Sequence, residues 1–207
     1  MSFNNTGTER RGPRIGAVVL AAGLSSRMGV NKLLLPLKGK PLVRHAVDAA
    51  AASRCDPVIV VIGDNCGQIE AASCTHKVRF VKIRDFTGGL SELLKCGLRT
   101  LPPDCEGVAV LLGDMPFVTS QLIDVLIAAF DPTDGRAICV PVHRGQRGNP
   151  VLWDRQFFPE MLALEGDTGA KQLLIRHQAM LYELEVADDG PLTDIDTPED
   201  LAAYEAP

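Results

Sequence analysis

The amino-acid sequence predicts an α/β fold, with a doubly wound, mostly parallel sheet and helices on both of its faces. Three continuous apolar runs have the composition of strands buried on both faces, and they occupy residues 15–21, 58–62 and 108–112. Helical patterns lie between these runs, and strands that alternate with helices imply right-handed βαβ crossovers. In such sheets ligands bind beyond the carboxyl ends of the strands, so functional residues are expected there.

Each element of this fold has its own signal along the chain. The first apolar run leads directly into a turn, Ala22 to Ser26, and predicts a buried strand that opens into a loop. The next segment begins with Pro41, a residue favoured at the first helical position, and predicts a helix over 41–53. The other predicted elements are weaker strands at 78–83 and 138–142, and helices at 91–100, at 119–130 and from Pro198 onward.

Length and charge bound the domain organisation and the classes of partner. At 207 residues the chain is long enough for one substantial core but short for two full domains, so we expect a flexible tail over 1–14 and a single domain over 15–207. The formal net charge of -5 offers no excess of positive charge for a nucleic-acid backbone or an anionic membrane. No apolar run approaches the roughly 20 residues of a membrane-spanning helix, and the polar N-terminus lacks a secretory signal, so a cytoplasmic location is expected.

The first candidate site is the glycine-containing loop after the first strand. The sequence there reads Leu-Ala-Ala-Gly-Leu-Ser-Ser-Arg-Met-Gly from Leu20 to Gly29, and Lys32 follows three residues further on. Glycines let backbone N–H groups approach phosphate oxygens, and Arg27 and Lys32 supply the positive charge that a triphosphate needs. The spacing fits neither a Walker P-loop nor a G-x-G-x-x-G fingerprint, so an ordinary strand-to-helix turn with solvated Arg27 and Lys32 is the alternative.

Carboxylates form the second candidate site. Asp114 follows the buried strand 108–112, where a lone carboxylate is well placed to hold Mg²⁺ together with phosphate oxygens and water. A turn-forming aspartate is the alternative for this position. Asp194 and Asp196 are spaced by two on an extended segment, so their side chains point the same way and one of them can be a second ligand. Thr197, by contrast, is explained as the cap of a final helix.

Together these segments predict attack on a phosphorus atom. They provide a phosphate-binding loop, two cations and separated carboxylates, whereas the sequence contains no Ser-His-Asp or Cys-His arrangement that suggests a covalent route. The six dispersed cysteines include no C-x-x-C pair, so neither a zinc site nor a disulfide framework is expected. Nucleotidyl transfer suits this set of residues because positioning and charge neutralisation supply most of its catalysis.

Five motifs also occur in the order found in a known family. They are L-A-A-G-L-S-S-R-M-G-x-x-K, G-D-M-P, R-G-N-P-V-L, G-D-T-G-A-K and D-I-D-T-P-E-D-L. Over residues 15–204 the chain resembles the molybdenum-cofactor cytidylyltransferases of the MobA-like nucleotidyltransferase family. The resemblance implies a Rossmann-like fold of the nucleotide-diphospho-sugar transferase type. It implies that Mg²⁺-bound CTP is attacked by the terminal phosphate of molybdenum-loaded molybdopterin, with release of pyrophosphate, and that a molybdoenzyme or its maturation factor is a protein partner.

The same resemblance implies roles for individual residues. Arg27, Lys32 and Asp114 would be catalytic, and Asp114 and Asp196 would bind the magnesium. The implied nucleotide-binding residues are Leu20, Ala21, Ala22, Gly23, Arg27, Lys32, Gly63, Ser91 and Asp114. The implied acceptor-binding residues are Arg147, Asn149, Asp167 and Lys171, where basic groups would meet the pterin phosphate; two ordinary solvated surface turns are the alternative.

Substrate choice depends on a few further positions. Ala22 stands where guanylyl-transferring relatives typically have glycine, which favours CTP over GTP. Glu92 and Lys95 replace a serine and an arginine of the family pattern, and the glutamate either changes the charge of the site or faces solvent on a first helical turn. The alternative functions are a transferase of the same fold that uses GTP or acts on a sugar phosphate or other small phosphorylated alcohol, and a non-catalytic cofactor carrier. Retention of two cations and two carboxylates argues against a carrier, which needs no triphosphate site.

Overall fold

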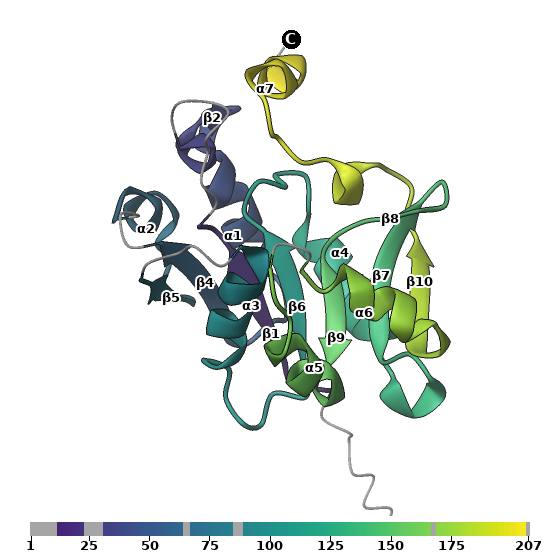
Figure 1. Ribbon diagram of the computed structural model, residues 1–207. Coiled ribbons are helices and arrows are strands. Elements are labelled where there is room, and N and C mark those ends of the chain that lie inside the picture. Colours follow the sequence, from purple (N-terminus) through teal and green to yellow (C-terminus); the bar gives the residue numbers. More distant parts are fainter. Residues whose placement is uncertain (1–11, 23–30, 64–66, 85–88, 167–168, 206–207) are drawn as a thin grey trace, which may run out of the picture.

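The computed structural model describes residues 12–22, 31–63, 67–84, 89–166 and 169–205, and these form an eight-stranded sheet with helices on both faces (Figure 1). This is the α/β architecture that the sequence predicts. The strands of the main sheet are β1 (Ile15–Leu20), β4 (Val58–Gly63), β5 (Val78–Ile83), β6 (Gly107–Leu112), β7 (Ile138–His143), β8 (Gln146–Arg147), β9 (Val151–Asp154) and β10 (Leu181–Glu185). A separate small hairpin consists of β2 (Pro36–Leu37) and β3 (Lys40–Pro41).

The sheet is mostly parallel, with one antiparallel strand inserted near its middle. Its strand order is β10-β7-β9-β6-β1-β4-β5, and β8 pairs with β7. β1 runs parallel to β4 and to β6, and β5 continues the parallel set beyond β4. β9 is antiparallel to both β6 and β7, while β10 is again parallel to β7. The prediction of a mostly parallel sheet is therefore confirmed, but β9 has no counterpart in the sequence prediction.

The strand order contains a topological switch point beside β1. From β1 the chain builds β4 and β5 on one side, and it then returns to place β6 on the other side of β1. The crossovers diverge beyond the carboxyl ends of β1 and β6, which is where doubly wound sheets bind their ligands. A 3.0 Å hydrogen bond from the Gly113 N–H to the Leu20 carbonyl joins these two strand ends.

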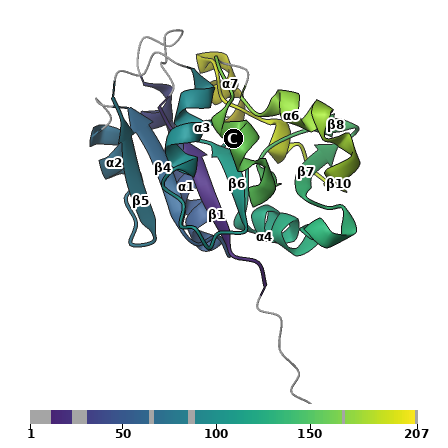
Figure 2. The same ribbon diagram turned by 60° about the horizontal axis from the view of Figure 1, so that its bottom comes forward.

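Helices on the two faces of the sheet form two separate cores (Figures 1 and 2). One face carries α1 (Leu42–Ala52), α2 (Gly67–Ser73) and α4 (Ser120–Ala129), and the other carries α3 (Leu90–Leu98), α5 (Phe158–Leu162) and α6 (Lys171–Arg176). Successive residues of β1 divide between the cores, because Ala17 and Val19 pack in the first and Val18 and Leu20 in the second. This double burial explains why the strand is a continuous apolar run in the sequence.

The three longest predicted helices are present within two residues of their expected bounds, as α1, α3 and α4. Thr119 caps α4 as expected, since its hydroxyl accepts a 3.2 Å hydrogen bond from the Leu122 N–H. Pro41 precedes α1 as its N-cap residue instead of occupying the first helical position. Single-turn 3₁₀ helices complete the described elements: Lys32–Leu34, Pro132–Asp134, Arg155–Phe157, Gln178–Met180 and Gly190–Leu192.

The last helix, α7 (Pro198–Glu205), lies beside the β2–β3 hairpin and away from the main sheet (Figure 1). A small apolar cluster of Leu37, Leu42 and Ile195 joins these segments. The ring of Tyr204 on α7 also lies 4.6 Å from the ring of Phe117, measured between centroids. The C-terminal segment is therefore anchored to the loop that follows β6.

Arg14 is connected to the folded domain by ion pairs. Its guanidinium forms ion pairs with Asp56 at 3.0 Å and with Asp104 at 2.5 Å, although the sequence prediction places this residue in a flexible tail over 1–14. The ordered part thus extends at least to Arg14, because these two pairs tie it to the loops before β4 and β6. Residues 1–11 of the predicted tail lie outside the described residues.

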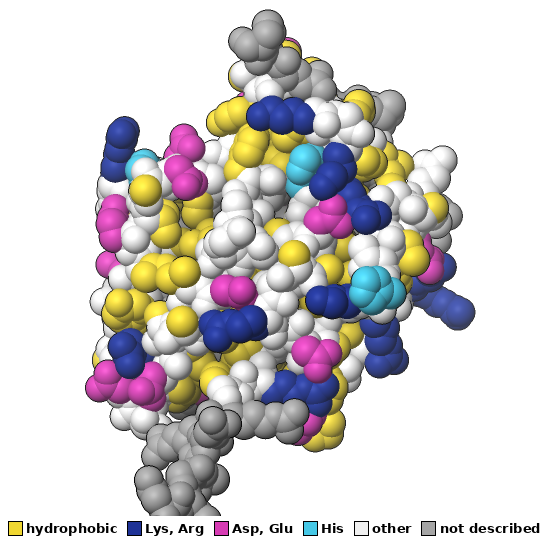
Figure 3. All heavy atoms as spheres, turned by 180° about the vertical axis from the view of Figure 1, so that it is seen from behind, with side chains coloured by type: hydrophobic (Ala, Val, Ile, Leu, Met, Phe, Trp, Pro, Cys, Tyr) yellow, Lys and Arg dark blue, Asp and Glu magenta, His cyan; other side chains and the backbone are white. Residues whose placement is uncertain are grey.

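The face opposite to that of Figure 1 carries paired charges. In Figure 3, basic and acidic side chains lie next to one another over much of this face. Asp48 on α1 accepts hydrogen bonds from Lys40 at 2.8 Å and Arg44 at 2.6 Å, and Arg54 lies 3.7 Å from Asp124 on α4. These pairs connect α1 with the hairpin and with α4. Among the described residues, no helix combines the length and the apolar character that crossing a bilayer requires.

Candidate functional site

The candidate site lies at the carboxyl ends of β1 and β6. Leu20, Ala21 and Ala22 are buried at the end of β1, and the Ala21 N–H donates a 2.9 Å hydrogen bond to the Val61 carbonyl on β4. The end of β1 is thus held by its neighbours on both sides of the sheet. Three of the predicted nucleotide-binding residues form this rigid base, whereas Gly23 and Arg27 of the following loop lie outside the described residues.

Lys32 is the central cation of the site. Its Nζ donates to Asp114 Oδ2 at 2.7 Å and to Asp196 Oδ1 at 2.5 Å, and only 14% of its side chain is exposed. The backbone around Lys32 is fixed because the Asn31 side chain accepts a 3.1 Å hydrogen bond from the Leu33 N–H, and Leu33 is buried in the core. The structure therefore brings together three residues that the sequence predicts separately.

Asp114 reaches the site from the turn that follows β6. Its side chain is 22% exposed, and its backbone carbonyl accepts a 3.0 Å hydrogen bond from the Ile195 N–H. This bond fixes the Asp194-Ile195-Asp196 segment against the end of β6. While Oδ2 of Asp114 accepts from Lys32, Oδ1 is buried and has no hydrogen-bond partner among the described residues. A buried carboxylate oxygen without a partner is unfavourable unless another group, such as a cation, satisfies it.

The donor set fits a magnesium ion bound mainly through phosphate. Within the described part of the chain, no group of three or more His, Cys, Asp or Glu side chains has an arrangement suited to a metal. Asp114 and Asp196 nevertheless converge on one cation, and Asp114 has an oxygen to spare. Magnesium typically uses one or two carboxylates and completes its octahedron with water and substrate phosphates. These residues therefore suit a metal that arrives with a nucleotide.

The electrostatics of the site follow from burial and close pairing. Burial opposes the charge of Lys32, but the hydrogen bonds to Asp114 and Asp196 outweigh it, so the pKa of Lys32 lies above its usual value. Lys32 is therefore a permanent cation at neutral pH. Burial raises the pKa of Asp194, and the neighbouring charges of Asp196 and Asp114 raise it further. Asp194 thus lies close to the carboxylate pair without being an ion-pair partner of Lys32.

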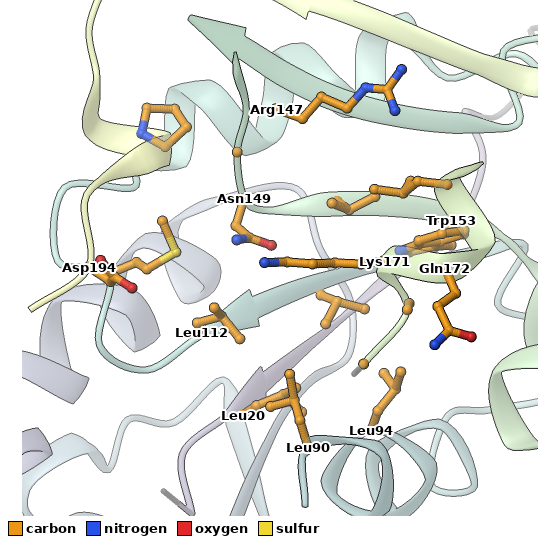
Figure 4. A pocket seen from close by; sticks show the side chains of 18 of the residues that line it. Leu20, Leu90, Leu94, Leu112, Arg147, Asn149, Trp153, Lys171, Gln172 and Asp194 are labelled. Carbon is orange, nitrogen blue, oxygen red and sulfur yellow. The ribbon is translucent and has the colours of Figure 1, made fainter. Parts of the chain in front are cut away.

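A pocket of about 780 Å³ opens beside these strand ends (Figure 4). Leu20, Leu90 and Leu94 form one side, and Asn149 and Lys171 lie opposite them. Most of the wall is apolar, with Trp153 at its far end from Asp194. The polar side chains in the wall are Arg147, Asn149, Lys171, Gln172 and Asp194. A pocket of this size accommodates an organic molecule larger than a simple phosphate.

The predicted acceptor residues line this pocket but differ in their contacts. Arg147 forms a 2.6 Å ion pair with Glu183 on β10, so its charge is compensated. Asn149 is held by its backbone, whose N–H donates to the Pro191 carbonyl at 2.8 Å. Lys171 begins α6, takes part in no ion pair with any described residue, and points toward the Asn149 amide in Figure 4. Asp167 lies outside the described residues.

Two predicted nucleotide-binding residues lie apart from the pocket. Ser91 is fully buried in the first turn of α3, and its N–H donates a 3.4 Å hydrogen bond to the Gly166 carbonyl. Gly63 is the last residue of β4, at the same edge of the sheet as the end of β1. Glu92 pairs with Lys95 at 2.7 Å, so the acidic departure from the family pattern is neutralised within α3.

The pocket also contains residues that carry no functional signal in the sequence. Trp153 comes from the unpredicted strand β9, and Pro191 and Leu192 come from a single-turn helix near the C-terminus. Gln172 follows Lys171 on the short helix α6. Apolar side chains in short elements resemble ordinary core residues, so only the packed structure shows that they face a pocket.

Comparison with known proteins gives a consistent result. The sequence profile of the MobA-like NTP transferase domain matches residues 17–180. The chain is similar to the purine catabolism protein PucB of Bacillus subtilis, with 33% identity over 92% of this chain and 95% of PucB. It is also similar to the molybdenum cofactor cytidylyltransferase of Escherichia coli, with 27% identity over 90% of this chain and 93% of that protein.

Solved structures agree with this similarity. The crystal structure of Rv0371c from Mycobacterium tuberculosis has a TM-score of 0.83 and 28% identity, and the match covers 94% of this chain and 98% of that one. A structure of the same mycobacterial protein in complex with manganese has a TM-score of 0.79 and 27% identity, with the same two coverages. The structural similarity therefore extends over nearly the whole chain.

Proposed function

The chain belongs to the MobA-like NTP transferase family, and from that premise we propose that it moves CMP from CTP to the terminal phosphate of molybdenum-loaded molybdopterin. Pyrophosphate is the other product, and magnesium is the metal. One observation carries the proposal. Lys32, Asp114 and Asp196 come from distant parts of the sequence and meet at the ends of β1 and β6, beside a pocket of about 780 Å³.

The triphosphate is proposed to bind over the end of β1, next to Lys32. The ammonium of Lys32 is held in place by Asp114 and Asp196, so little reorganisation is needed at this position. Because the two carboxylates compensate its charge, Lys32 is proposed to act on the phosphates together with the Mg²⁺ that binds these carboxylates. Arg27, in the loop after β1, is proposed as a second cation for the triphosphate. Ala22 at the buried end of β1 supports CTP as the nucleotide, because guanylyl-transferring relatives have glycine at this position.

Magnesium is proposed to be held by Asp114 and Asp196. The buried Oδ1 of Asp114 lacks a hydrogen-bond partner among the described residues and supports this assignment. The manganese complex of Rv0371c supports a divalent metal in proteins of this fold. When bound, Mg²⁺ supplies charge stabilisation at the α-phosphate and at the leaving pyrophosphate. The chain's own contribution is to place two carboxylates and one ammonium at a fixed strand end.

The composition of the pocket supports a pterin acceptor over a sugar phosphate. Its walls are mostly apolar and include several leucine side chains and Trp153, and these can pack against the faces of a flat ring system. A sugar would leave several hydroxyl groups against apolar walls, and each buried hydroxyl without a partner costs about 1–3 kcal/mol. Lys171 and Asn149 provide polar contacts on the opposite side, where a phosphate or the polar ring edge can be bound.

Pyrophosphate release tests the proposal. The full chain is incubated with Mg²⁺ and each of CTP, GTP, ATP and UTP, with and without molybdenum-loaded molybdopterin. We expect release only when CTP and the pterin are both present. Release with GTP would overturn the base assignment, and release with a sugar phosphate in place of the pterin would overturn the acceptor. Pterin binding without release from any nucleotide would support a carrier.

A further inference from the structure

Asp196 is the most exposed group at the candidate metal site, yet its position is closely fixed. Its side chain is 43% exposed, compared with 22% for Asp114 and 14% for Lys32. An exposed carboxylate near the end of a chain loses conformational freedom when it is held in one position, and this opposes metal binding. The structure must therefore hold the backbone of Asp196 by other contacts.

The residue before Asp196 provides the first of these contacts. Ile195 is fully buried in the cluster with Leu37 and Leu42, and its N–H donates a 3.0 Å hydrogen bond to the Asp114 carbonyl. These contacts locate the backbone that enters Asp196. They do not fix the backbone on the C-terminal side of Asp196.

Asp200, in the first turn of α7, provides contacts on the other side. Its Oδ2 accepts hydrogen bonds from the Thr197 N–H at 2.8 Å and from the Asp196 N–H at 3.1 Å. In return, Thr197 Oγ1 accepts a 3.1 Å hydrogen bond from the Asp200 N–H. The two bonds between Thr197 and Asp200 form a reciprocal capping box, which explains these residues structurally. The bond to Asp196 lies outside that box, because capping of α7 does not require it.

We propose that Asp200 is a positioning residue that acts through Asp196: its carboxylate binds the Asp196 N–H and so directs the Asp196 side chain into the candidate metal site. This inference rests on the proposed function, since it takes Asp196 to be a metal ligand.

Manganese binding to the full chain tests this role directly. Electron paramagnetic resonance measures free Mn²⁺ in the presence of CTP and without acceptor, so the readout does not depend on turnover. Because CTP itself binds Mn²⁺, a sample with CTP and no protein gives the baseline that is subtracted. We expect Asp200→Ala to weaken Mn²⁺ binding about 10-fold or more, the usual size of the effect when a group that orients a metal ligand is removed. Asp200→Asn retains an oxygen that can accept both backbone hydrogen bonds, and it is expected to restore most of the affinity.

Two further variants separate positioning from helix capping and from the proposed function. Thr197→Ala removes one half of the capping box but keeps the Asp200 contact with Asp196, so it is expected to bind Mn²⁺ like the wild type. Asp196→Asn is the reference for loss of the ligand itself, and circular dichroism checks the fold of every variant. In steady-state assays, Asp200→Ala is expected to raise the KM for Mg²⁺ while kcat recovers at saturating metal.

The outcomes distinguish the two levels of inference. Wild-type Mn²⁺ affinity in Asp200→Ala overturns the positioning role, provided that Asp196→Asn binds weakly. Equal losses in Thr197→Ala and Asp200→Ala also overturn it, because helix capping alone would then explain the effect. If Asp196→Asn binds Mn²⁺ as the wild type does, the metal assignment of the proposed function fails, and the reason for positioning Asp196 fails with it.

Discussion

Replacement of Gly148 by alanine tests how the acceptor loop is joined to the C-terminal segment. A methyl group at this position would lie 2.3 Å from the Pro191 carbonyl oxygen and 2.7 Å from its carbonyl carbon. Both are backbone atoms, so no side-chain rotation relieves the overlap. Moving the oxygen contact from 2.3 Å to at least 3.0 Å requires a shift of about 0.7 Å. The adjacent 2.8 Å hydrogen bond from the Asn149 N–H to the same carbonyl is then stretched or broken.

This shift predicts separate effects of Gly148→Ala on stability and on catalysis. Overpacking of this kind costs about 1–3 kcal/mol, and each kcal/mol lowers Tm by about 2–4 °C in a domain of this size, so a fall of about 2–12 °C is expected. Misplacement of a substrate-binding group by about 1 Å can lower the rate about 100-fold. We therefore expect kcat/KM for the acceptor to fall about 10- to 100-fold. The KM for CTP should change less, because Gly148 lies in the acceptor loop and does not contact Lys32, Asp114 or Asp196 through any hydrogen bond or ion pair of the described residues.

Thermal unfolding and pyrophosphate release with each substrate varied in turn measure these effects. Gly67→Ala is the matched control, since a methyl group at Gly67 on α2 meets nothing within 4 Å. The control should match the wild type in both assays. An unchanged Tm and acceptor KM in Gly148→Ala would refute the close join between loop and C-terminal segment. A parallel rise in the KM for CTP would refute the separation of the two binding regions.

Three further predictions concern the metal site, a buried thiol and a surface ion pair. Asp114→Ala should lower pyrophosphate release at least about 100-fold with an unchanged circular dichroism spectrum. The control Asp134→Ala, on an exposed turn, should release pyrophosphate at the wild-type rate. Full activity in Asp114→Ala contradicts the metal assignment. Burial raises the pKa of the Cys139 thiol to about 12, so this thiol stays protonated at mildly alkaline pH. Iodoacetamide should therefore modify the exposed Cys74 and leave Cys139 unmodified until the protein unfolds, and mass spectrometry measures both modifications. Burial opposes the charge of Asp48, but hydrogen bonds from two neighbouring cations hold its pKa below the usual value. The contribution of this ion pair to stability is present above the unfolded pKa of about 3.9 and is lost as the pH falls through the lower folded pKa. Asp48→Asn should therefore lower the free energy of unfolding by about 0.5–1 kcal/mol at neutral pH and leave it unchanged below the folded pKa. Urea unfolding at several pH values measures this difference.

The parts of the fold that the sequence predicts are those with a strong local signal. β1, β4 and β6 are buried on both faces, and each is an unbroken apolar run in the sequence. β9 has only four residues, and its antiparallel place between β6 and β7 depends on tertiary contacts with no local signature. β10 lies at the edge of the sheet and is short, and its partly buried Tyr182 and Leu184 alternate with exposed Glu183 and Glu185. This is a weak period-2 strand signal that the sequence prediction did not use.

The candidate site divides in the same way. Lys32, Asp114 and Asp196 could be named from the sequence because each follows a strand or precedes a helix with a clear signal. The sequence could not predict that the Lys32 ammonium contacts both Asp114 and Asp196. These contacts depend on how the C-terminal segment packs against the end of β6. The role of Arg147 was equally hidden, because its partner Glu183 lies on the unpredicted strand β10.

The choice of acceptor must come from the parts of the chain outside the common nucleotide site. The segment that carries Asp194 and Asp196 also carries the pocket residues Pro191 and Leu192. This segment therefore contributes both a candidate metal ligand and part of the pocket wall. Within the wall, the charge of Arg147 is already compensated by Glu183, whereas Lys171 has no ion-pair partner among the described residues. We therefore expect a phosphate that enters the pocket to gain more from Lys171 than from Arg147, because among the described residues only Arg147 already has an ion-pair partner.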